Sequence, residues 1–366
     1  MNDSFEKINI LGLERSKLRE ILSESLDLTP YRAKQLFSWL YRKKVTDFNL
    51  MTDISKSLRN ELCSRFYISR LKIITHEESS DGSRKYLFSL DDGSEVESVL
   101  IKQPTRFTLC ISSQVGCAIG CKFCRTAQMG LKRNLSAAEI IGQVIAVQED
   151  VKLRDDRGGE DGREAFQNIV FMGMGEPLHN KNSVISAVKV LNDELGLNFS
   201  GRKITVSTSG LVPAIKEFGL SGARANLAIS LNATTDEVRS EIMPINNRWP
   251  LKDLIQTLRE YPLRPHRRIT FEYVMLGDIN DSDDDIQRLP QLLKGIPAKI
   301  NLIPYNTNAG LGFKQPSTER VYYWQKRLLE MGLNSTIRWS KGNDISAACG
   351  QLATKSEMER RRKIAA

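Results

Sequence analysis

Three cysteines, Cys117, Cys121 and Cys124, stand within the nine-residue segment 116–124, which also holds two glycines. The segment follows a run of residues, 106–111, that is predicted to form a β-strand. Three thiolates on one short loop, which glycines allow to wrap closely, suit a 4Fe-4S cluster with three ligated irons and one open iron. Structural zinc normally takes four ligands in paired Cys-x2-Cys units. Because the sequence has neither a second pair nor a nearby histidine, iron-sulfur is favoured over zinc.

Composition places the chain among globular proteins. Its 366 residues correspond to roughly two domains of about 150 residues. Apolar residues make up 40% of the chain and charged residues 27%, a composition that excludes collagen-like and wholly disordered proteins. An acidic N-terminus and the lack of a long apolar run argue against export and membrane spanning, so a cytoplasmic protein with six reduced cysteines is expected. The net charge of +9 favours a polyanionic partner such as nucleic acid, although a merely basic soluble protein is not excluded by charge alone.

Extended and helical patterns alternate after residue 105, which indicates an α/β fold with a parallel sheet. Six strands are expected, at 106–111, 169–172, 203–207, 227–231, 269–275 and 299–303. Helices are expected at 136–149, 182–195, 250–260, 283–294 and 317–331, the first with a capping box of Ser136 and Glu139. A ligand site in such a sheet lies at the carboxyl ends of the strands. Residues 150–164, dense in charge and glycine, are expected to form a surface insertion.

The first seventy residues are predicted to be helical. Thr29 is expected to cap a helix that starts at Pro30, and a second amphipathic segment surrounds Leu58. Basic residues that include Arg42 and Lys43 fall mostly on the other side of the first helix. This basic face is either a solvated surface or a nucleic-acid contact, and the pattern does not decide between them.

A β-hairpin is predicted at 85–102, because two alternating segments flank an Asp-Gly step. On its second strand Glu97 is in phase with Val99 and Ile101, so an acid shares a face with apolar residues. The residues alone leave two interpretations open. Glu97 either lies on an edge strand and turns to water, or serves a functional role.

The cysteine segment, placed after the first expected barrel strand, resembles that of the radical S-adenosylmethionine enzymes. The segment 173–177, Gly-Met-Gly-Glu-Pro, is similar to the GGEP segment with which those enzymes bind the cofactor. Within that superfamily, six segments spread over nearly the whole chain resemble the RlmN/Cfr family of RNA methyltransferases: 112–117, 173–178, 207–210, 230–233, 301–306 and 347–352.

The resemblance implies a partial (β/α)6 TIM-like barrel with a small helical N-terminal domain and a β extension. The expected domains are 1–70, helical and RNA-binding; 71–104, the hairpin extension; 105–345, the barrel; and 346–366, a C-terminal segment with a catalytic cysteine and a basic tail. It also implies one 4Fe-4S cluster on Cys117, Cys121 and Cys124, and two molecules of S-adenosylmethionine per turnover. Contacts to that cofactor are expected at Gly175, Glu176, Ser207, Ser230, Leu231, Asn232 and Asn306.

The reaction implied by the resemblance is methylation of carbon 2 of an adenosine in 23S rRNA and of the adenosine next to the anticodon in tRNA. The alternative within the family is the Cfr-type reaction at carbon 8. Carbon 2 is an electron-poor carbon that cannot attack a sulfonium methyl group, so a radical route is required. By resemblance, Cys349 is methylated and then joined to the base, Cys110 releases the product by forming a disulfide with Cys349, and Glu97 accepts a proton.

Several of these residues also have a structural interpretation. Cys349 in its small-residue segment is as consistent with a buried inert thiol, Cys63 is expected to pack in the helical unit, and the serines and asparagines could cap strand ends. Asn232 stands where some family members have histidine. Expected partners are 23S rRNA, tRNA, a flavodoxin-like reductant and a thiol reductant, with no membrane and a monomeric state. The rival from another class is a non-catalytic RNA-binding protein with a structural cluster.

Overall fold

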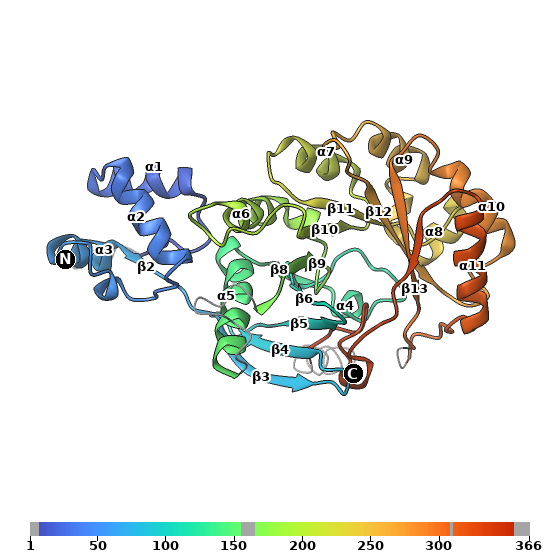
Figure 1. Cartoon of the computed structure of the whole chain (residues 1–366), viewed down its shortest axis with the longest axis horizontal. Helices are drawn as coiled ribbons and strands as arrows, with labels where there is room; N and C mark the ends of the chain where they lie inside the picture. The colour runs from blue at the N-terminus through green and yellow to red at the C-terminus, as the bar shows by residue number, and fades with distance from the viewer. Residues whose placement is uncertain (1–6, 155–164, 308–309, 355–366) are drawn as a thin grey trace.

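One ten-stranded sheet organises the molecule, whose computed structural model describes residues 7–154, 165–307 and 310–354 (Figure 1). The strand order is β14-β13-β12-β11-β10-β9-β6-β5-β4-β3, and the strands from β6 to β14 run parallel. These parallel strands are β6 (Arg106–Cys110), β9 (Asn168–Phe171), β10 (Ile204–Thr208), β11 (Asn226–Ser230), β12 (Ile269–Met275), β13 (Ala298–Pro304) and β14 (Ser335–Ile337). The order confirms the predicted α/β class and the partial barrel.

The hydrophobic core lies between the outer face of this sheet and the helices that cover it (Figure 1). Val206, Ile229, Phe271 and Leu302 on the central strands are fully buried. Burying such a side chain contributes about 1.5–3 kcal/mol. The helices of the barrel are α5 (Ala137–Arg154), α6 (Lys181–Asn192), α7 (Val212–Leu220), α8 (Asp236–Ile242), α9 (Leu251–Arg259), α10 (Asp283–Leu292) and α11 (Thr318–Glu330).

Most predicted elements are confirmed, including all six strands, the five helices and the capping box, in which Ser136 Oγ accepts from Glu139 N at 3.1 Å. Strand β14 and helices α7 and α8 were not predicted. Thr29 is the N-cap residue of α2 and Pro30 its first residue, as predicted, although the side chain of Thr29 makes no capping hydrogen bond. Of the predicted insertion, residues 150–154 belong to α5; 155–164 and the basic tail lie outside the described residues.

The predicted hairpin is present and continues the barrel sheet through β3 (Lys72–Glu78), β4 (Arg84–Ser89) and β5 (Glu95–Gln103), which pair antiparallel. Strand β5 is bordered by β4 and β6, so it is not an edge strand. Glu97 on this strand is buried, with 5% of its surface exposed. The interpretation of Glu97 as a water-facing residue of an edge strand is therefore wrong.

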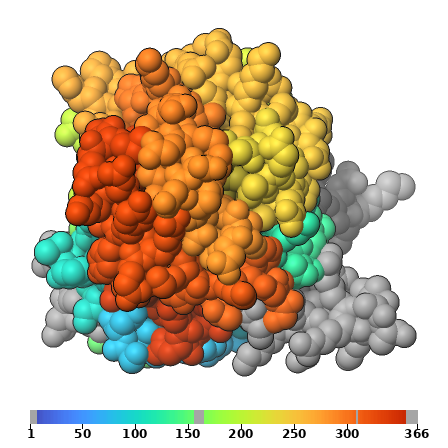
Figure 2. All heavy atoms as spheres, turned by 90° about the vertical axis from the view of Figure 1, so that its right-hand side faces the viewer, coloured from blue at the N-terminus to red at the C-terminus, as the bar shows by residue number. Residues whose placement is uncertain are grey.

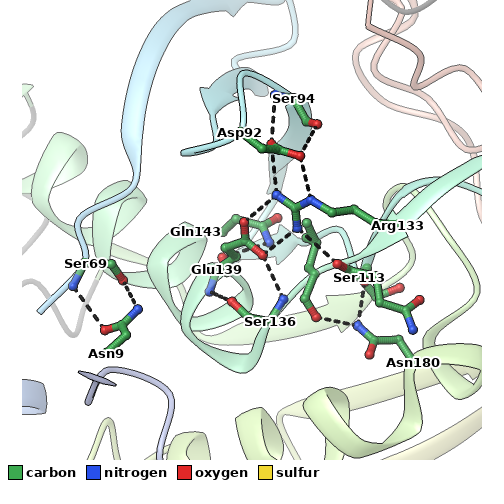
Figure 3. A network of polar contacts seen from close by, with 12 residues as sticks. Asn9, Ser69, Asp92, Ser94, Ser113, Arg133, Ser136, Glu139, Gln143 and Asn180 are labelled. Atoms are coloured by element: carbon green, nitrogen blue, oxygen red, sulfur yellow. Dashed lines mark hydrogen bonds and ion pairs between the residues drawn. The ribbon is translucent and has the colours of Figure 1, made fainter. Parts of the chain in front are cut away.

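The segment 117–124, here called the cysteine loop, leaves β7 (Gln114–Gly116) and passes through the short helix α4 (Arg125–Gln128) into β8 (Leu131–Asn134). Gly116 has φ +76°, and a Cβ there would lie 1.7 Å from the carbonyl oxygen of Gly130. Arg133 on β8 bonds Asp92 of the hairpin turn at 2.8 Å and Glu139 of α5 at 2.8 Å (Figure 3). This network ties the base of the cysteine loop to the hairpin and to α5.

The N-terminal unit lies to one side of the barrel (Figure 1). It contains α1 (Arg15–Leu26), α2 (Pro30–Tyr41), α3 (Lys56–Arg65) and a parallel pair of short strands, β1 (Ile8–Asn9) and β2 (Phe66–Tyr67). Arg15 pairs with Asp193 at 3.2 Å, and Arg42 donates to the carbonyl oxygen of Glu194. Arg42 thus contacts the barrel. No helix in the described part of the chain is long and apolar enough to cross a membrane.

The C-terminal segment crosses from β14 to the hairpin, and Figure 2 shows its red atoms beside the blue atoms of the hairpin. Asp344 accepts from Ser79 Oγ at 2.6 Å and from the backbone N–H of Ser80 at 2.9 Å. Lys85 Nζ donates to the carbonyl oxygen of Ile345 at 2.6 Å, and the N–H of Gly342 donates to Asp81 at 2.9 Å. These bonds fix the segment that carries Cys349.

Candidate active site

A cavity of about 170 Å³, here called the strand-end cavity, lies at the carboxyl ends of the parallel strands, where the sequence placed a ligand site. The predicted site residues among its lining are Cys117, Cys121, Cys124, Gly175, Glu176, Ser207, Ser230, Asn232, Asn306 and Cys349. They come from segments more than two hundred residues apart. The structure therefore brings together most of the residues that were predicted to bind the cluster and S-adenosylmethionine.

The three thiols of the cysteine loop face this cavity and belong to no disulfide. Burial raises the pKa of the Cys117 thiol to about 12 and raises the pKa of Cys121 and Cys124 as well. In the described residues no three His, Cys, Asp or Glu side chains are arranged to hold a single metal ion. The fit to an iron-sulfur cluster rests on the donors themselves, because three soft sulfur ligands on one wrapped loop suit iron-sulfur chemistry. Metal coordination would keep these thiols deprotonated despite their burial.

Glu176 is held in one orientation at the floor of the cavity. Its carboxylate accepts from the N–H of Leu178 at 2.9 Å and from the N–H of Ser209 at 2.7 Å, and burial raises its pKa. Gly175 precedes it with φ +99°, and a Cβ there would lie 2.5 Å from Cβ of Gln114. Only glycine fits at position 175, where the backbone packs directly against Gln114.

The predicted cofactor contacts at the strand ends differ in the bonds that they already make within the protein. Asn232, with φ +58°, accepts from the N–H of Val274 at 2.8 Å, so it serves as a strand-end bridge as well as a wall of the cavity. Asn306 donates to Ser340 Oγ at 2.6 Å. Leu231 is fully buried and is absent from the cavity lining; its N–H donates to the carbonyl oxygen of Glu272 at 3.0 Å. The side chain of Leu231 is therefore a support of the strand end in this structure.

Three buried polar atoms of residues that line the cavity have no hydrogen-bond partner in the described part of the protein: Ser209 Oγ, Glu272 Oε2 and Tyr305 Oη. Buried polar groups are normally paired, and leaving one unpaired costs about 1–3 kcal/mol. A polar ligand would supply the missing partners. Together with the thiols and Glu176, these atoms fit a cofactor with both charged and polar groups.

A second and larger cavity of about 970 Å³, here called the barrel cavity, lies inside the sheet and is lined by Cys110 and Cys349. Seven residues line both cavities: Cys124, Met172, Gly173, Glu272, Arg338, Cys349 and Gly350. Cys349 therefore stands where the two cavities meet. Cys110, at the end of β6, lines only the barrel cavity of the two.

Two hydrogen bonds from α4 hold the residues that directly follow Cys349. The N–H of Arg125 donates to the carbonyl oxygen of Gly350 at 2.8 Å, and Thr126 Oγ1 donates to that of Leu352 at 2.6 Å. Both cysteines are free thiols. Burial, with a smaller contribution from Cys349, raises the pKa of Cys110 to about 12 against the opposing charge of the Arg338 guanidinium.

Glu97 lies beside the segment that carries Cys349 and is absent from the lining of both cavities. Its carboxylate accepts from the N–H of Ala353 at 3.0 Å and lies 3.6 Å from Lys85 Nζ. Burial raises the pKa of Glu97, and the charge of Lys85 opposes that shift. The structure thus places Glu97 near the catalytic candidates but behind the C-terminal segment.

Sequence reasoning missed three charged residues of the site. Arg338 and Glu272 line both cavities, and buried Arg239 donates to the carbonyl oxygens of Ser209, Ser230 and Leu231. Glu272 had a signal, since it is an acid within the apolar run of β12. Arg338 follows β14, a strand too short to be predicted.

Comparison with known proteins gives matches over nearly the whole chain. Residues 8–68 match the model of the ribosomal RNA large subunit methyltransferase N-terminal domain, and residues 111–289 match that of the radical SAM superfamily. The chain is 50% identical to "Dual-specificity RNA methyltransferase RlmN" of Geobacter sulfurreducens, over 95% of this chain and 92% of that protein. It is 48% identical to the protein of the same name from Syntrophotalea carbinolica, over 96% and 91% of the two chains.

A solved structure agrees with these matches. A radical SAM methyltransferase from Sphaerobacter thermophilus superposes with a TM-score of 0.85 at 41% identity, covering 94% of this chain and 99% of that one. The similarity therefore extends over the N-terminal unit, the hairpin and the barrel together.

Proposed function

The chain belongs to the RlmN family of radical S-adenosylmethionine RNA methyltransferases, and on this premise we propose that it methylates carbon 2 of an adenosine in 23S rRNA and of the adenosine next to the anticodon in tRNA. The position of Cys349 carries the proposal. On one side lies the cavity of the three thiols and Glu176, and on the other lies the larger cavity of Cys110. A group carried on Cys349 can thus be received on one side and delivered on the other.

As a member of this family, the enzyme uses a 4Fe-4S cluster and S-adenosylmethionine. In the proposal, Cys117, Cys121 and Cys124 hold the cluster, and the other residues of the strand-end cavity hold the cofactor. When bound, these groups supply the methyl group and the one-electron chemistry that the electron-poor carbon 2 of adenine requires. Gly175 and Glu176 orient the cofactor, with Ser207, Ser230, Asn232 and Asn306 along the strand ends, and Leu231 supports them from behind.

The Cys349 thiolate is the proposed methyl carrier. Its sulfur takes one methyl group. In the barrel cavity one hydrogen atom leaves that methyl group and the carbon becomes bonded to carbon 2 of the adenine; that hydrogen atom and the one electron left on the adduct would be taken up by the groups bound in the strand-end cavity. The hydrogen bonds to Gly350 and Leu352 hold the segment while this bond forms. Positioning of this kind lowers the barrier by holding the reacting atoms in place.

Release of the product is assigned to Cys110. Its thiolate attacks the sulfur of Cys349, the new S–S bond forms, and the bond between that sulfur and the attached carbon breaks. The electron pair of the broken bond goes to the carbon, which takes up a proton to complete the methyl group. A thiol reductant outside the chain then restores both cysteines.

Glu97 is the proposed acceptor of the proton that leaves carbon 2. Its burial disfavours the charged form, so a proton is bound more readily than by an exposed carboxyl. Its bond to the N–H of Ala353 means that the C-terminal segment must shift before the carboxylate reaches the base. The remaining elements of the proposal are a flavodoxin-like electron donor, a monomeric state and a cytoplasmic setting.

Mapping of methyladenosine isomers tests this function. The wild-type protein and Cys349→Ala are each produced in a host that lacks its own enzyme, and nucleosides from 23S rRNA and tRNA are separated and identified by mass. The proposal predicts 2-methyladenosine in both RNAs with the wild-type protein and in neither with the variant. Predominant 8-methyladenosine would contradict the assignment of carbon 2 and favour the Cfr-type reaction.

A further inference from the structure

The barrel cavity has an unusual wall. Closed (β/α)8 barrels are ordinarily filled by bulky branched side chains. Here most of the strand residues that line the cavity are small and polar, namely Thr108, Asn168, Thr205, Asn226, Thr270 and Asn301, with Val170 among them. The barrel interior is thus a polar passage that reaches Cys110 and Cys349 at its upper end.

Cations surround the other end of this passage. Arg106 starts β6, Arg202 and Lys203 directly precede β10, and Lys299 is the second residue of β13. We call these four residues the basic rim; all are exposed and all line the barrel cavity. The starts of parallel strands lie at one edge of a sheet, so the rim occupies the face opposite the cysteine loop.

The charge of the basic rim is not neutralised by the described part of the protein. None of the four residues forms an ion pair there, and Glu272 is the one acidic residue among the described residues that line the cavity. Burial lowers the pKa of Arg267, and the nearby charges of Arg202 and Arg264 lower it further. Unpaired cations in such number at a cavity mouth attract a polyanion.

We propose that the RNA enters the barrel from this face, with its phosphates on the basic rim and the target nucleotide extended up the polar passage to Cys349. The inference rests on the proposed function, in which an adenosine of RNA is the substrate. Enzymes that modify a base take it out of the stack and into a pocket, and a cavity of about 970 Å³ has room for one nucleotide. The hydroxyl and amide side chains of the passage can bond the sugar and the base.

The basic rim is tested by a matched pair of triple variants. Arg202→Gln, Lys203→Gln and Lys299→Gln remove three charges from the rim, and Lys216→Gln, Lys252→Gln and Lys326→Gln remove three from the exposed faces of α7, α9 and α11. Binding of a tRNA transcript is measured over a range of salt concentrations. The rim variant should bind at least tenfold more weakly, with a log-log salt slope smaller by about 2, since each lost phosphate contact of a single strand removes about 0.7. Equal losses in the two variants would overturn the proposal.

The passage itself is tested by Thr205→Phe, which places a bulky ring in the wall of the barrel cavity. This variant should still acquire a methyl group on Cys349 without RNA, while RNA methylation falls at least a hundredfold. RNA methylation at the wild-type rate would overturn access through the barrel. A wild-type protein that yields no 2-methyladenosine would contradict the proposed function. The comparison of RNA affinities needs no methyl transfer, so it would still test whether the basic rim binds RNA.

Discussion

The buried thiols of the cysteine loop are costly to ionise, which makes metal binding the main reason for them to be thiolates. Replacement of Cys121 by Ala should remove most of the iron from anaerobically prepared protein, because three ligands become two. Cys63→Ala is the matched control, since Cys63 lies on α3 far from the site. Iron content and the visible absorption of the cluster measure the outcome. A Cys121→Ala protein with wild-type iron content would exclude this loop as the cluster site.

Arg338 is the cation that favours the Cys110 thiolate against burial. Removing the guanidinium by Arg338→Gln should raise the pKa of Cys110 further, so at a given pH a smaller fraction is thiolate. The rate of disulfide formation between Cys110 and Cys349 in a glutathione disulfide buffer should fall, and its pH profile should move to higher pH, rising about tenfold per unit below the pKa.

Arg338→Lys is the control for that profile, because it keeps the positive charge in the cavity. It should restore most of the rate of disulfide formation, although a lysine cannot reproduce the fork of the guanidinium. If Arg338→Gln gave the same pH profile as the wild-type protein, the charge of Arg338 would have no role at the two thiols.

At the scale of elements, the anchor of the C-terminal segment depends on one carboxylate. The hydrogen bond from Ser79, followed by that from the N–H of Ser80, lowers the pKa of Asp344 to about 2. The folded pKa is thus below the ordinary value near 4, so the anchor is complete above that value and is lost as pH falls toward 2. Asp344→Asn should loosen the segment at neutral pH.

Alkylation of Cys349 and hydrogen exchange of residues 342–353 measure this loosening. Both should become several-fold faster in Asp344→Asn, whereas Asp253→Asn, an exposed change on α9, should leave them unaltered. In the wild-type protein the same acceleration should appear only in strong acid. Identical exchange in both variants at pH 7 would show that Asp344 does not hold the segment.

The elements show what sequence could predict. Long segments such as β12 and α11 were predicted because apolar residues, among them Phe271 and Trp324, recur in them at the spacing of a strand or a helix. Strand β14 was missed because three residues, Ser335–Ile337, carry no period; it exists because β13 offers it a pairing edge. Arg338, which directly follows β14, was therefore not predicted as a site residue. Glu97 could not be placed because burial of β5 on both sides depends on β4 and on the C-terminal segment, which lie far away in sequence.

At the scale of the whole molecule, the chain separates two tasks at opposite ends of one sheet. The carboxyl ends of the strands gather the thiols and Glu176, the starts of the strands carry the basic rim, and Cys349 stands at the junction. The motifs predicted the first group because its residues are close together in sequence. The polar passage and the rim were not predicted, because single Thr, Asn and Lys residues on different strands become one surface only when the sheet curves.

The central claim is that Cys349 carries the carbon and Cys110 releases it. Each cysteine is replaced by Ala, the proteins are incubated with substrate RNA under turnover conditions, and covalent RNA-protein species are separated under denaturing conditions. Neither variant should give methylated RNA, but Cys110→Ala should accumulate the covalent species, whereas Cys349→Ala and the double variant should have none. Equal amounts of the adduct in both single variants, or its absence from Cys110→Ala, would contradict the claim.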